Sequence, residues 1–300
     1  MSVAEYPALL PGALVHRRQL TEVLLTAIER TSETTFSAGV HWPRRHPYFG
    51  PYGPEDVDVT PALALETLRQ AAIALAHIHL NVPLGYAFLM ESMHVEIVGG
   101  ARRSAAQPGN HTVDIEVSDL VERRGIAATY GSLLTIRDGD TVLARGGGGA
   151  RAIPAPVYRR SREGAPSSSE PERLAPRPAP ASAALVGAPG PDFVLVTGQA
   201  GGDRYQLSLD VDNPVYFDHP LDHVPGMVVL EAALQAFRAR AAEPTLTPDS
   251  VTVDFARHTE LTQPVVIDVV AADGEAVATF TQNGSVNSRV RASRFRQSGA

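Results

Sequence analysis

The sequence has 300 residues, 44% of them hydrophobic, with a formal net charge of −7 and an isoelectric point near 5.8. This acidic balance argues against sequence-independent binding of nucleic acid. The N-terminus lacks the basic and apolar regions of a signal peptide, and no apolar run is long enough to span a bilayer. We therefore expect a cytoplasmic protein that binds neither nucleic acid nor a membrane.

Two residue types are missing from the chain. It contains no cysteine, and all 26 of its Lys and Arg residues are arginine. Disulfides, thiol nucleophiles and Schiff bases on a lysine amine are therefore excluded. Carboxylate, imidazole, hydroxyl and guanidinium groups remain for any acyl or carbonyl chemistry.

The first half of the chain reads as strands followed by one long helix. Residues 13–42 are rich in β-branched and apolar side chains, which favours strands. Thr60 as N-cap and Pro61 in the first turn predict the start of a helix over residues 62–80. Asn81 marks its end. Because this helix is apolar nearly all round, we expect it to lie buried at the centre of a domain.

Strand patterns dominate after this helix. Residues 113–120, 127–137 and 141–145 alternate apolar and polar side chains, and a turn at 138–140 predicts a hairpin. The glycine run 146–149 lacks the Lys-Ser/Thr pair of a phosphate-binding P-loop. A bulged or twisted strand is the favoured interpretation.

Residues 163–191 are mostly Pro, Ala, Ser and Glu, a composition typical of a linker. Strands are predicted at 193–197 and 205–209, followed by a helix with Pro225 suited to its first position. The remaining strands are expected at 251–255, 265–270, 276–282 and 286–293. The predicted organisation is an N-terminal domain at 1–162, a linker at 163–191 and a C-terminal domain at 192–300.

The two halves repeat one another. A shift of 165 residues places Glu66 over Glu231 and Gln70 over Gln235. Each half is expected to pack one buried helix against a mostly antiparallel sheet, which is an α+β architecture. The pattern resembles a tandem hotdog fold, in which each of two antiparallel sheets wraps around a long central helix.

Glu66, Arg69 and Gln70 project from one face of the first long helix because they are three and four residues apart. They fit an acid/base carboxylate beside an anion-binding guanidinium. They also fit an ion pair between Glu66 and Arg69 with a purely structural role. The repetition of Glu and Gln in the second helix favours function.

A loop with two histidines precedes the second helix. The spacing of His219 from Glu231 resembles that of hotdog dehydratases acting on acyl-carrier-protein thioesters. In that resemblance, a loop histidine and an acidic residue on the central helix share one site. Asp218, Asp222 and His223 have a plain alternative as loop residues near a helix N-terminus, where the helix dipole favours negative charge. His41, His46, His77 and His79 match no metal-ligand spacing and have no carboxylate among them, so we expect no metal.

Several motifs are similar to those of A-factor synthases, across most of the chain outside the linker. The family makes γ-butyrolactone, butenolide or furan signalling molecules. The resemblance implies transfer of a β-ketoacyl group from acyl carrier protein to dihydroxyacetone phosphate, without a cofactor. The motifs are Val15-His16-Arg17-Arg18 with Glu22-Val23, the loop with His41-Trp42-Pro43-Arg44 and His46-Pro47, Glu66 to Gln70, His77 with Val82 to Gly85, and Asp218 to Gly226 with Leu230-Glu231-Ala232.

The resemblance also implies roles for individual residues. We predict that Glu66, Arg69, His219 and Glu231 are catalytic. We predict that the substrate is bound by Gln70, Gln235, Arg44, His46, Asp222 and Gly226. Backbone N–H groups at a helix N-terminus, near Pro225-Gly226 or Pro61-Ala62, would hold the thioester oxyanion.

The second repeat departs from the family pattern at Leu234, where an arginine is usual. Either the Glu231 site is altered or the anion is bound elsewhere. If each site mixes the two halves, Glu66 and Arg69 would face the His219 loop, which is the favoured arrangement. The alternatives are a thioester dehydratase or hydratase and a non-catalytic binding protein. The sequence leaves open the acyl chain length, the ring type of the product and the oligomeric state.

Overall fold

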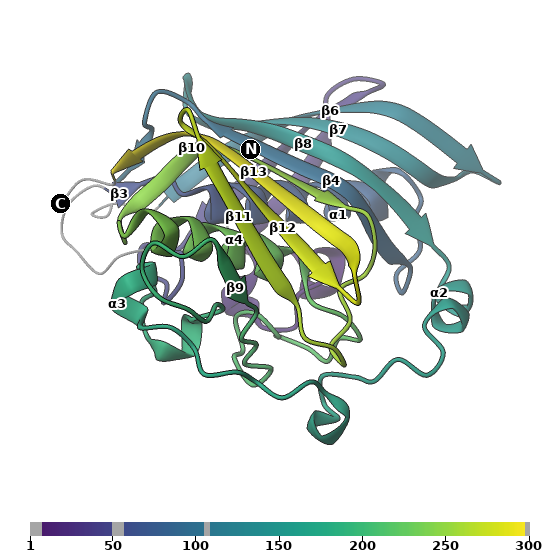
Figure 1. Cartoon of the computed structure of the whole chain (residues 1–300). Coiled ribbons are helices and arrows are strands. Elements are labelled where there is room, and N and C mark those ends of the chain that lie inside the picture. The colour runs from purple at the N-terminus through teal and green to yellow at the C-terminus, as the bar shows by residue number, and fades with distance from the viewer. Residues whose placement is uncertain (1–7, 50–56, 105–108, 298–300) are drawn as a thin grey trace. The chain divides into compact units, whose positions relative to one another are not determined.

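The computed structural model describes residues 8–49, 57–104 and 109–297. These residues form two compact units, Met1–Glu163 and Gly164–Ala300. In Figure 1 the first unit runs from purple to teal and the second from green to yellow.

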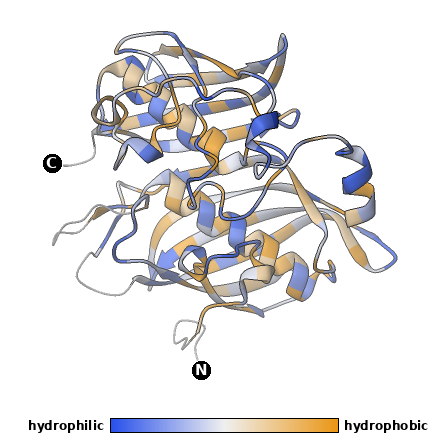
Figure 2. Cartoon of the chain, turned by 90° about the horizontal axis from the view of Figure 1, so that it is seen from below, coloured by the Kyte–Doolittle hydropathy of each residue, from blue (hydrophilic) through white to orange (hydrophobic). Residues whose placement is uncertain are grey.

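The first unit contains one antiparallel sheet with the strand order β1-β2-β6-β7-β8-β4. A separate two-stranded sheet pairs β3 with β5, so two sheets alone do not account for the strands of the chain. Figure 2 shows hydrophobic and hydrophilic residues interleaved along the ribbons. The strands are β1 (Leu25–Arg30), β2 (Thr35–Trp42), β3 (Val57–Asp58), β4 (Ala87–Ile97), β5 (Arg102–Arg103), β6 (Gly109–Arg123), β7 (Ile126–Asp138) and β8 (Thr141–Ile153).

The helix α1 (Pro61–His79) packs against β1, β4, β7 and β8 of this sheet. The side chain of Thr60 caps it by accepting the N–H of Leu63, as predicted. Asn81 adopts a left-handed φ of 57° just beyond the helix, which confirms the predicted end. The indole of Trp42 on β2 donates to Thr67 Oγ1 at 2.8 Å and ties the sheet to the buried helix.

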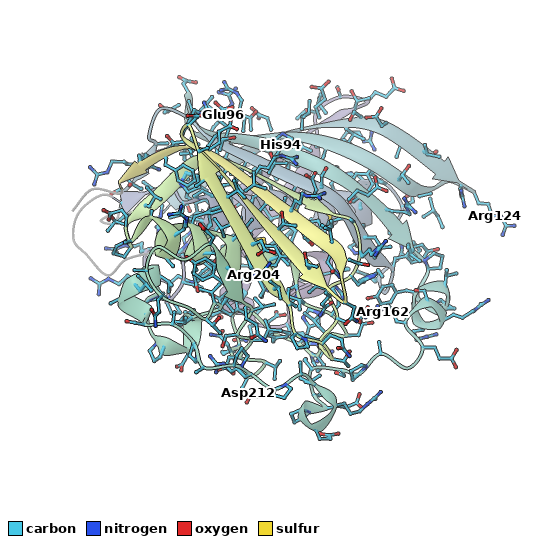
Figure 3. The ribbon with its side chains drawn as sticks, viewed as in Figure 1. His94, Glu96, Arg124, Arg162, Arg204 and Asp212 are labelled. Atoms are coloured by element: carbon cyan, nitrogen blue, oxygen red, sulfur yellow. The ribbon has the colours of Figure 1, made fainter. Side chains whose placement is uncertain are left out.

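The strand β4 alternates between buried apolar and exposed polar side chains along its C-terminal half. On β4, Met93, Val95 and Ile97 are buried while His94 and Glu96 are exposed, as expected for a strand covered on one side. Figure 3 labels His94 and Glu96, whose side chains project from the sheet.

The glycine run 146–149 lies inside β8, paired on both sides, which confirms the strand interpretation. A Cβ added at Gly146 would collide with the backbone oxygen of His94 and lie 2.6 Å from Leu68 Cδ1 on α1. Glycine is therefore needed where the central helix approaches the sheet closely. The register irregularity lies in the neighbouring strand β4, between Met90 and Ser92.

The second unit repeats this arrangement with the strand order β10-β13-β12-β11-β9. The helix α4 (Gly226–Ala241) packs on β10, β11, β12 and β13. Pro225 is the N-cap of α4 and not its first residue, which corrects the predicted start by one position. The strands are β9 (Arg204–Gln206), β10 (Leu246–Phe255), β11 (Val266–Ala272), β12 (Glu275–Gln282) and β13 (Ser285–Gln297).

Short helical segments complete the chain. Two of them, η1 and η2, occupy part of the region predicted as strand at 13–24, so that prediction is wrong there. In the region predicted as strand at 193–197, only Val196 forms a bridge, to Leu207. The segments are η1 (Gly12–Leu14), η2 (Leu20–Glu22), α2 (Ala155–Ser161), η3 (Pro171–Arg173), α3 (Ala183–Val186) and η4 (Pro191–Phe193).

The predicted domain boundaries at 162 and 191 stay a prediction. Residues 164–191 group with the second unit. Their backbone bonds to it, since Ala175 N donates to Leu261 O at 2.9 Å and Ala181 N donates to Val196 O at 2.8 Å.

Gly146→Ala should lower the free energy of unfolding by about 1–3 kcal/mol, because the added Cβ overpacks the contact between α1 and β8. Gly149→Ala is the matched control, since no heavy atom of the described residues, apart from Gly149 and its two chain neighbours, lies within 4 Å of its added Cβ. Urea unfolding followed by fluorescence of Trp42, the single tryptophan, reports on the first unit. Equal stability of the two variants would contradict the close approach.

Candidate functional site

Glu66 is fully buried on α1 and lies between two arginines. Arg69 binds both of its oxygens, with Nε 2.8 Å from Oε2 and Nη2 2.8 Å from Oε1. Arg17 donates to Oε1 from Nε at 3.0 Å, and its Nη2 lies 2.8 Å from the same oxygen. The side chains of Arg17 and Arg69 are only 11% and 16% exposed. This cluster of one carboxylate and two guanidinium groups carries a net charge of +1.

The surroundings fix the ionisation state of Glu66. Burial alone would raise the pKa of this carboxyl group, but the charges of Arg17 and Arg69 and the hydrogen bonds from Arg69 and Gln70 lower it to about 2. A carboxylate with such a pKa is a weak proton acceptor at neutral pH. The geometry therefore fits Glu66 as the residue that holds the two arginines in place.

Gln70 joins α1 to the segment before β1. Its Nε2 donates to Glu22 O and to Glu66 Oε1, both at 2.7 Å, and its Oε1 accepts the N–H of Leu24 at 2.9 Å. Both amide hydrogens are thus used inside the protein. Gln70 therefore holds the backbone at Glu22 and Leu24 against α1. Its amide has no free N–H to donate to a substrate, as the prediction would require.

His46 is buried together with Glu22, and its Nε2 lies 3.0 Å from Glu22 Oε1. Its Nδ1 accepts the N–H groups of Tyr48 and Phe49 at 3.2 and 3.1 Å. Nδ1 therefore carries no proton, and Nε2 donates to the carboxylate. Both ring nitrogens shape the loop after β2, so the structure provides no free nitrogen of His46 for the predicted substrate contact.

The second unit holds an equivalent cluster around Glu231, which is 5% exposed. Gln235 donates to Phe193 O at 2.8 Å and to Glu231 Oε1 at 3.1 Å, and accepts the N–H of Leu195 at 2.8 Å. This amide clamp repeats that of Gln70. It also leaves Gln235 without a free amide hydrogen for the predicted substrate contact.

Leu234 is buried, and the guanidinium partner of Glu231 comes from one turn further along α4. Arg238 Nη1 lies 3.4 Å from Glu231 Oε1 and also donates to Val186 O at 3.3 Å. Its Nε donates to Leu246 O at 3.1 Å. Arg238 is thus tied to the backbone at two points, which fits a structural ion pair.

Tyr216 also faces the Glu231 cluster, and its hydroxyl donates to Phe193 O at 3.3 Å. Burial raises the pKa of Tyr216 well above its usual value, and the Glu231 carboxylate raises it further. The phenol therefore stays protonated at neutral pH.

The loop before α4 pairs His219 with the preceding residue. His219 Nδ1 donates to Asp218 Oδ1, whose side chain is 1% exposed while the imidazole is 27% exposed. A neutral imidazole that donates from Nδ1 has its lone pair on Nε2. His219 Nε2 has no partner among the described residues, so the pair has the geometry of an oriented general base.

Four residues later, His223 Nδ1 lies 2.6 Å from Asp222 Oδ1. Here both side chains are partly exposed, at 28% and 23%, so the carboxylate is better solvated than Asp218. The His223 ring also contacts His258, with centroids 4.9 Å apart. Asp222 thus orients His223, and its predicted substrate contact stays a prediction.

Two further predicted residues have plain surroundings. Gly226 starts α4, and a Cβ added there would lie 2.9 Å from Phe255 Cζ, so a larger residue would have to displace the Phe255 ring. Arg44 is exposed on the loop after β2. Their roles with substrate stay predictions, as does the pairing of the Glu66 helix with the His219 loop.

Four residues complete these clusters without having been predicted as catalytic or substrate-binding: Arg17, Glu22, Asp218 and Arg238. The first three belong to the motifs quoted from the sequence, and Arg238 does not. Arg238 lies seven residues after Glu231 on one helix face, a spacing that could have indicated it. Arg17 belongs to a quoted motif, but it lies 49 residues before Glu66, and no local spacing indicates that the two side chains pair.

Among the described ranges, no three or more His, Asp or Glu side chains are grouped to hold a metal ion. In the part of the chain that the structure describes, no helix has the length and apolar character needed to cross a membrane. A surface cavity of about 340 Å³, lined by residues such as Arg30, Phe36 and His79, contains none of the predicted site residues.

Glu66→Gln should lower the free energy of unfolding at pH 7 by about 3–5 kcal/mol, because two buried guanidinium groups lose their counterion. Folding lowers the pKa of Glu66 from 4.5 to about 2. Its stabilisation is therefore present above pH 4.5 and is lost as the pH falls towards 2. Urea unfolding at several pH values should show the difference between wild type and variant shrinking below pH 4.5.

Glu231→Gln is the matched control, because Arg238 lies 3.4 Å from Glu231 Oε1, farther than Arg17 and Arg69 lie from Glu66, and Arg238 keeps its two backbone acceptors. We expect a smaller loss, measured for both variants by circular dichroism. A difference between wild type and Glu66→Gln that does not change with pH would rule out the charge argument.

Comparisons with known proteins agree with this duplicated architecture. A family model, the A-factor biosynthesis hotdog domain, matches residues 2–154 and 169–294. A 2-oxo-3-(phosphooxy)propyl 3-oxoalkanoate synthase from Streptomyces virginiae is 34% identical over 255 residues, covering 85% of this chain and 84% of that protein. A protein of the same name from Streptomyces coelicolor is 30% identical over 275 residues, covering 90% and 85%.

Among solved structures, an acyl-ACP thioesterase from Bacteroides thetaiotaomicron aligns with a TM-score of 0.50 at 12% identity. The alignment covers 87% of this chain and 98% of that one, and it supports the fold alone. The hotdog fold and the resemblance found in the motifs are confirmed by the family model and the Streptomyces relatives. Both halves of the chain carry the domain, and this protein belongs to the A-factor biosynthesis hotdog family.

Proposed function

We propose that this protein transfers a β-ketoacyl group from acyl carrier protein to a hydroxyl of dihydroxyacetone phosphate. The product would be a 2-oxo-3-(phosphooxy)propyl 3-oxoalkanoate, the compound in the names of the Streptomyces relatives. The observation that carries the chemistry is the Asp218–His219 pair, an oriented imidazole whose Nε2 is available to a substrate.

His219 would act first as base and then as acid. Its Nε2 takes the proton of the triose hydroxyl, and the oxygen attacks the thioester carbonyl. When the tetrahedral intermediate collapses, the carbon–sulfur bond breaks and the same proton returns to the leaving thiolate. Asp218 orients the ring and stabilises the imidazolium that forms.

The Arg17–Glu66–Arg69 cluster would bind the phosphate of the acceptor. Its net charge of +1 is held in a largely buried position, where an anion is attracted more strongly than in water. Arg69 Nη1 makes no hydrogen bond within the described residues, so one donor of its planar fork remains for the phosphate. Glu66 thereby serves as a positioning residue in place of the base predicted from sequence.

We expect incubation with a β-ketoacyl carrier protein and dihydroxyacetone phosphate to give the phosphooxypropyl ester, detected by mass spectrometry. His219→Gln should reduce the rate by about 10²- to 10⁴-fold, the usual cost of losing a general base. His223→Gln is the matched control in the same loop and should retain activity within about tenfold of wild type.

Other outcomes of this assay would reject the proposal. Gain or loss of water on the thioester without the triose would indicate a hydratase or dehydratase. An unchanged thioester in the presence of the triose would indicate a binding protein. Full activity of His219→Gln would remove His219 from the mechanism.

Arg69→Leu should lower kcat/KM for dihydroxyacetone phosphate by about tenfold to 150-fold, because a charge-assisted contact with phosphate is worth about 1.5–3 kcal/mol. Non-phosphorylated dihydroxyacetone should be affected far less. Arg238→Leu, which breaks the corresponding ion pair of α4, should lower the melting temperature. It should change kcat/KM by the same factor for both acceptors. If Arg69→Leu also lowered the melting temperature and changed kcat/KM equally for both acceptors, Arg69 would have a structural role and no role in binding phosphate.

A further inference from the structure

The loop that carries His219 is held by a residue from the stretch predicted as a linker. Ser168 N donates to Leu221 O at 2.7 Å, and Leu221 N donates to Ser168 Oγ at 3.1 Å. Ser168 is 8% exposed although its surroundings in sequence are polar. A single serine thus satisfies both backbone groups of Leu221.

Leu221 lies midway between the two histidines of the loop, His219 and His223. Backbone bonds also hold the loop near its ends, from Phe217 N to Asn213 O and from Val224 N to Thr259 O, each 2.9 Å. Ser168 therefore supplies a central support, two residues from the proposed base.

Ser168 is itself presented by a closed turn. Glu170 Oε1 accepts the N–H of Ser167 at 2.9 Å, and Glu170 N donates to Ser167 O at 2.9 Å. Arg173 then binds Glu170 Oε2 at 2.6 Å and Gly164 O at 2.9 Å. The turn 164–173 is thus cross-linked on both sides of Ser168, so it can act as a fixed point for the loop.

We propose that Ser168 is a positioning residue for His219, an inference that rests on the proposed function. Its hydroxyl keeps the Leu221 peptide, and with it the imidazole, in the orientation needed for proton transfer. A displacement of 1 Å at a reacting group can cost about a hundredfold in rate. Loss of one of the two bonds to Leu221 should cost about tenfold.

Ser168→Ala should lower kcat about tenfold and leave KM for dihydroxyacetone phosphate unchanged, because the phosphate contact is not altered. Ser168→Thr, which keeps a β-hydroxyl, should restore kcat. Ser169→Ala is the matched control, since the Ser169 side chain is exposed and bonds to Ser167. Circular dichroism melting of all three variants verifies that they fold.

A double-mutant cycle separates positioning from general stability. In the His219→Gln background, Ser168→Ala should cause no further loss of kcat, because the group it orients is gone. Additive losses, or Ser168→Ala activity equal to that of Ser169→Ala, would overturn the inference. Full activity of His219→Gln alone would instead overturn the proposed function, so the two failures are distinguishable.

Discussion

Each long helix carries one glutamine that determines how the chain enters its unit. Gln70 and Gln235 each bind one backbone oxygen and one backbone N–H, two residues apart, in the segment that precedes the first paired strands. Those backbone groups are buried and need partners. The amide therefore substitutes for a neighbouring strand, which explains why both segments were predicted as strands and neither forms one.

The same two glutamines also bind the buried glutamates of the long helices. Each also donates to the glutamate one turn before it, Glu66 or Glu231, so each carboxylate is part of the helix's structural network. In the first unit two arginines complete the network and lower the pKa of Glu66 to about 2. A buried carboxylate in such a network holds its cations in place and is poorly suited to accept a proton. Catalytic proton transfer therefore fits an imidazole better than Glu66.

The loop before α4 carries such an imidazole, that of His219, which is less buried than the two glutamates. The backbone of this loop is supported by Ser168, Asn213 and Thr259, while the ring of His219 is partly exposed. A fixed backbone with an accessible ring nitrogen is what a general base requires. The buried Asp218 carboxylate adds the orientation, and the more exposed Asp222–His223 pair lacks this burial.

The sequence alone determined the features that depend on local signals. The helix from Thr60 to Asn81, the hairpin at 138–140 and the repeat of Glu66 and Gln70 as Glu231 and Gln235 follow from capping residues, turn residues and periodicity. Only the tertiary structure decided the partners of those residues. Arg17 donates to Glu66, which lies 49 positions later in the sequence, and His46 donates to Glu22, which lies 24 positions earlier. The Ser168 side chain accepts the N–H of Leu221, 53 positions later. Such contacts form when distant segments pack together, so no spacing in the sequence encodes them.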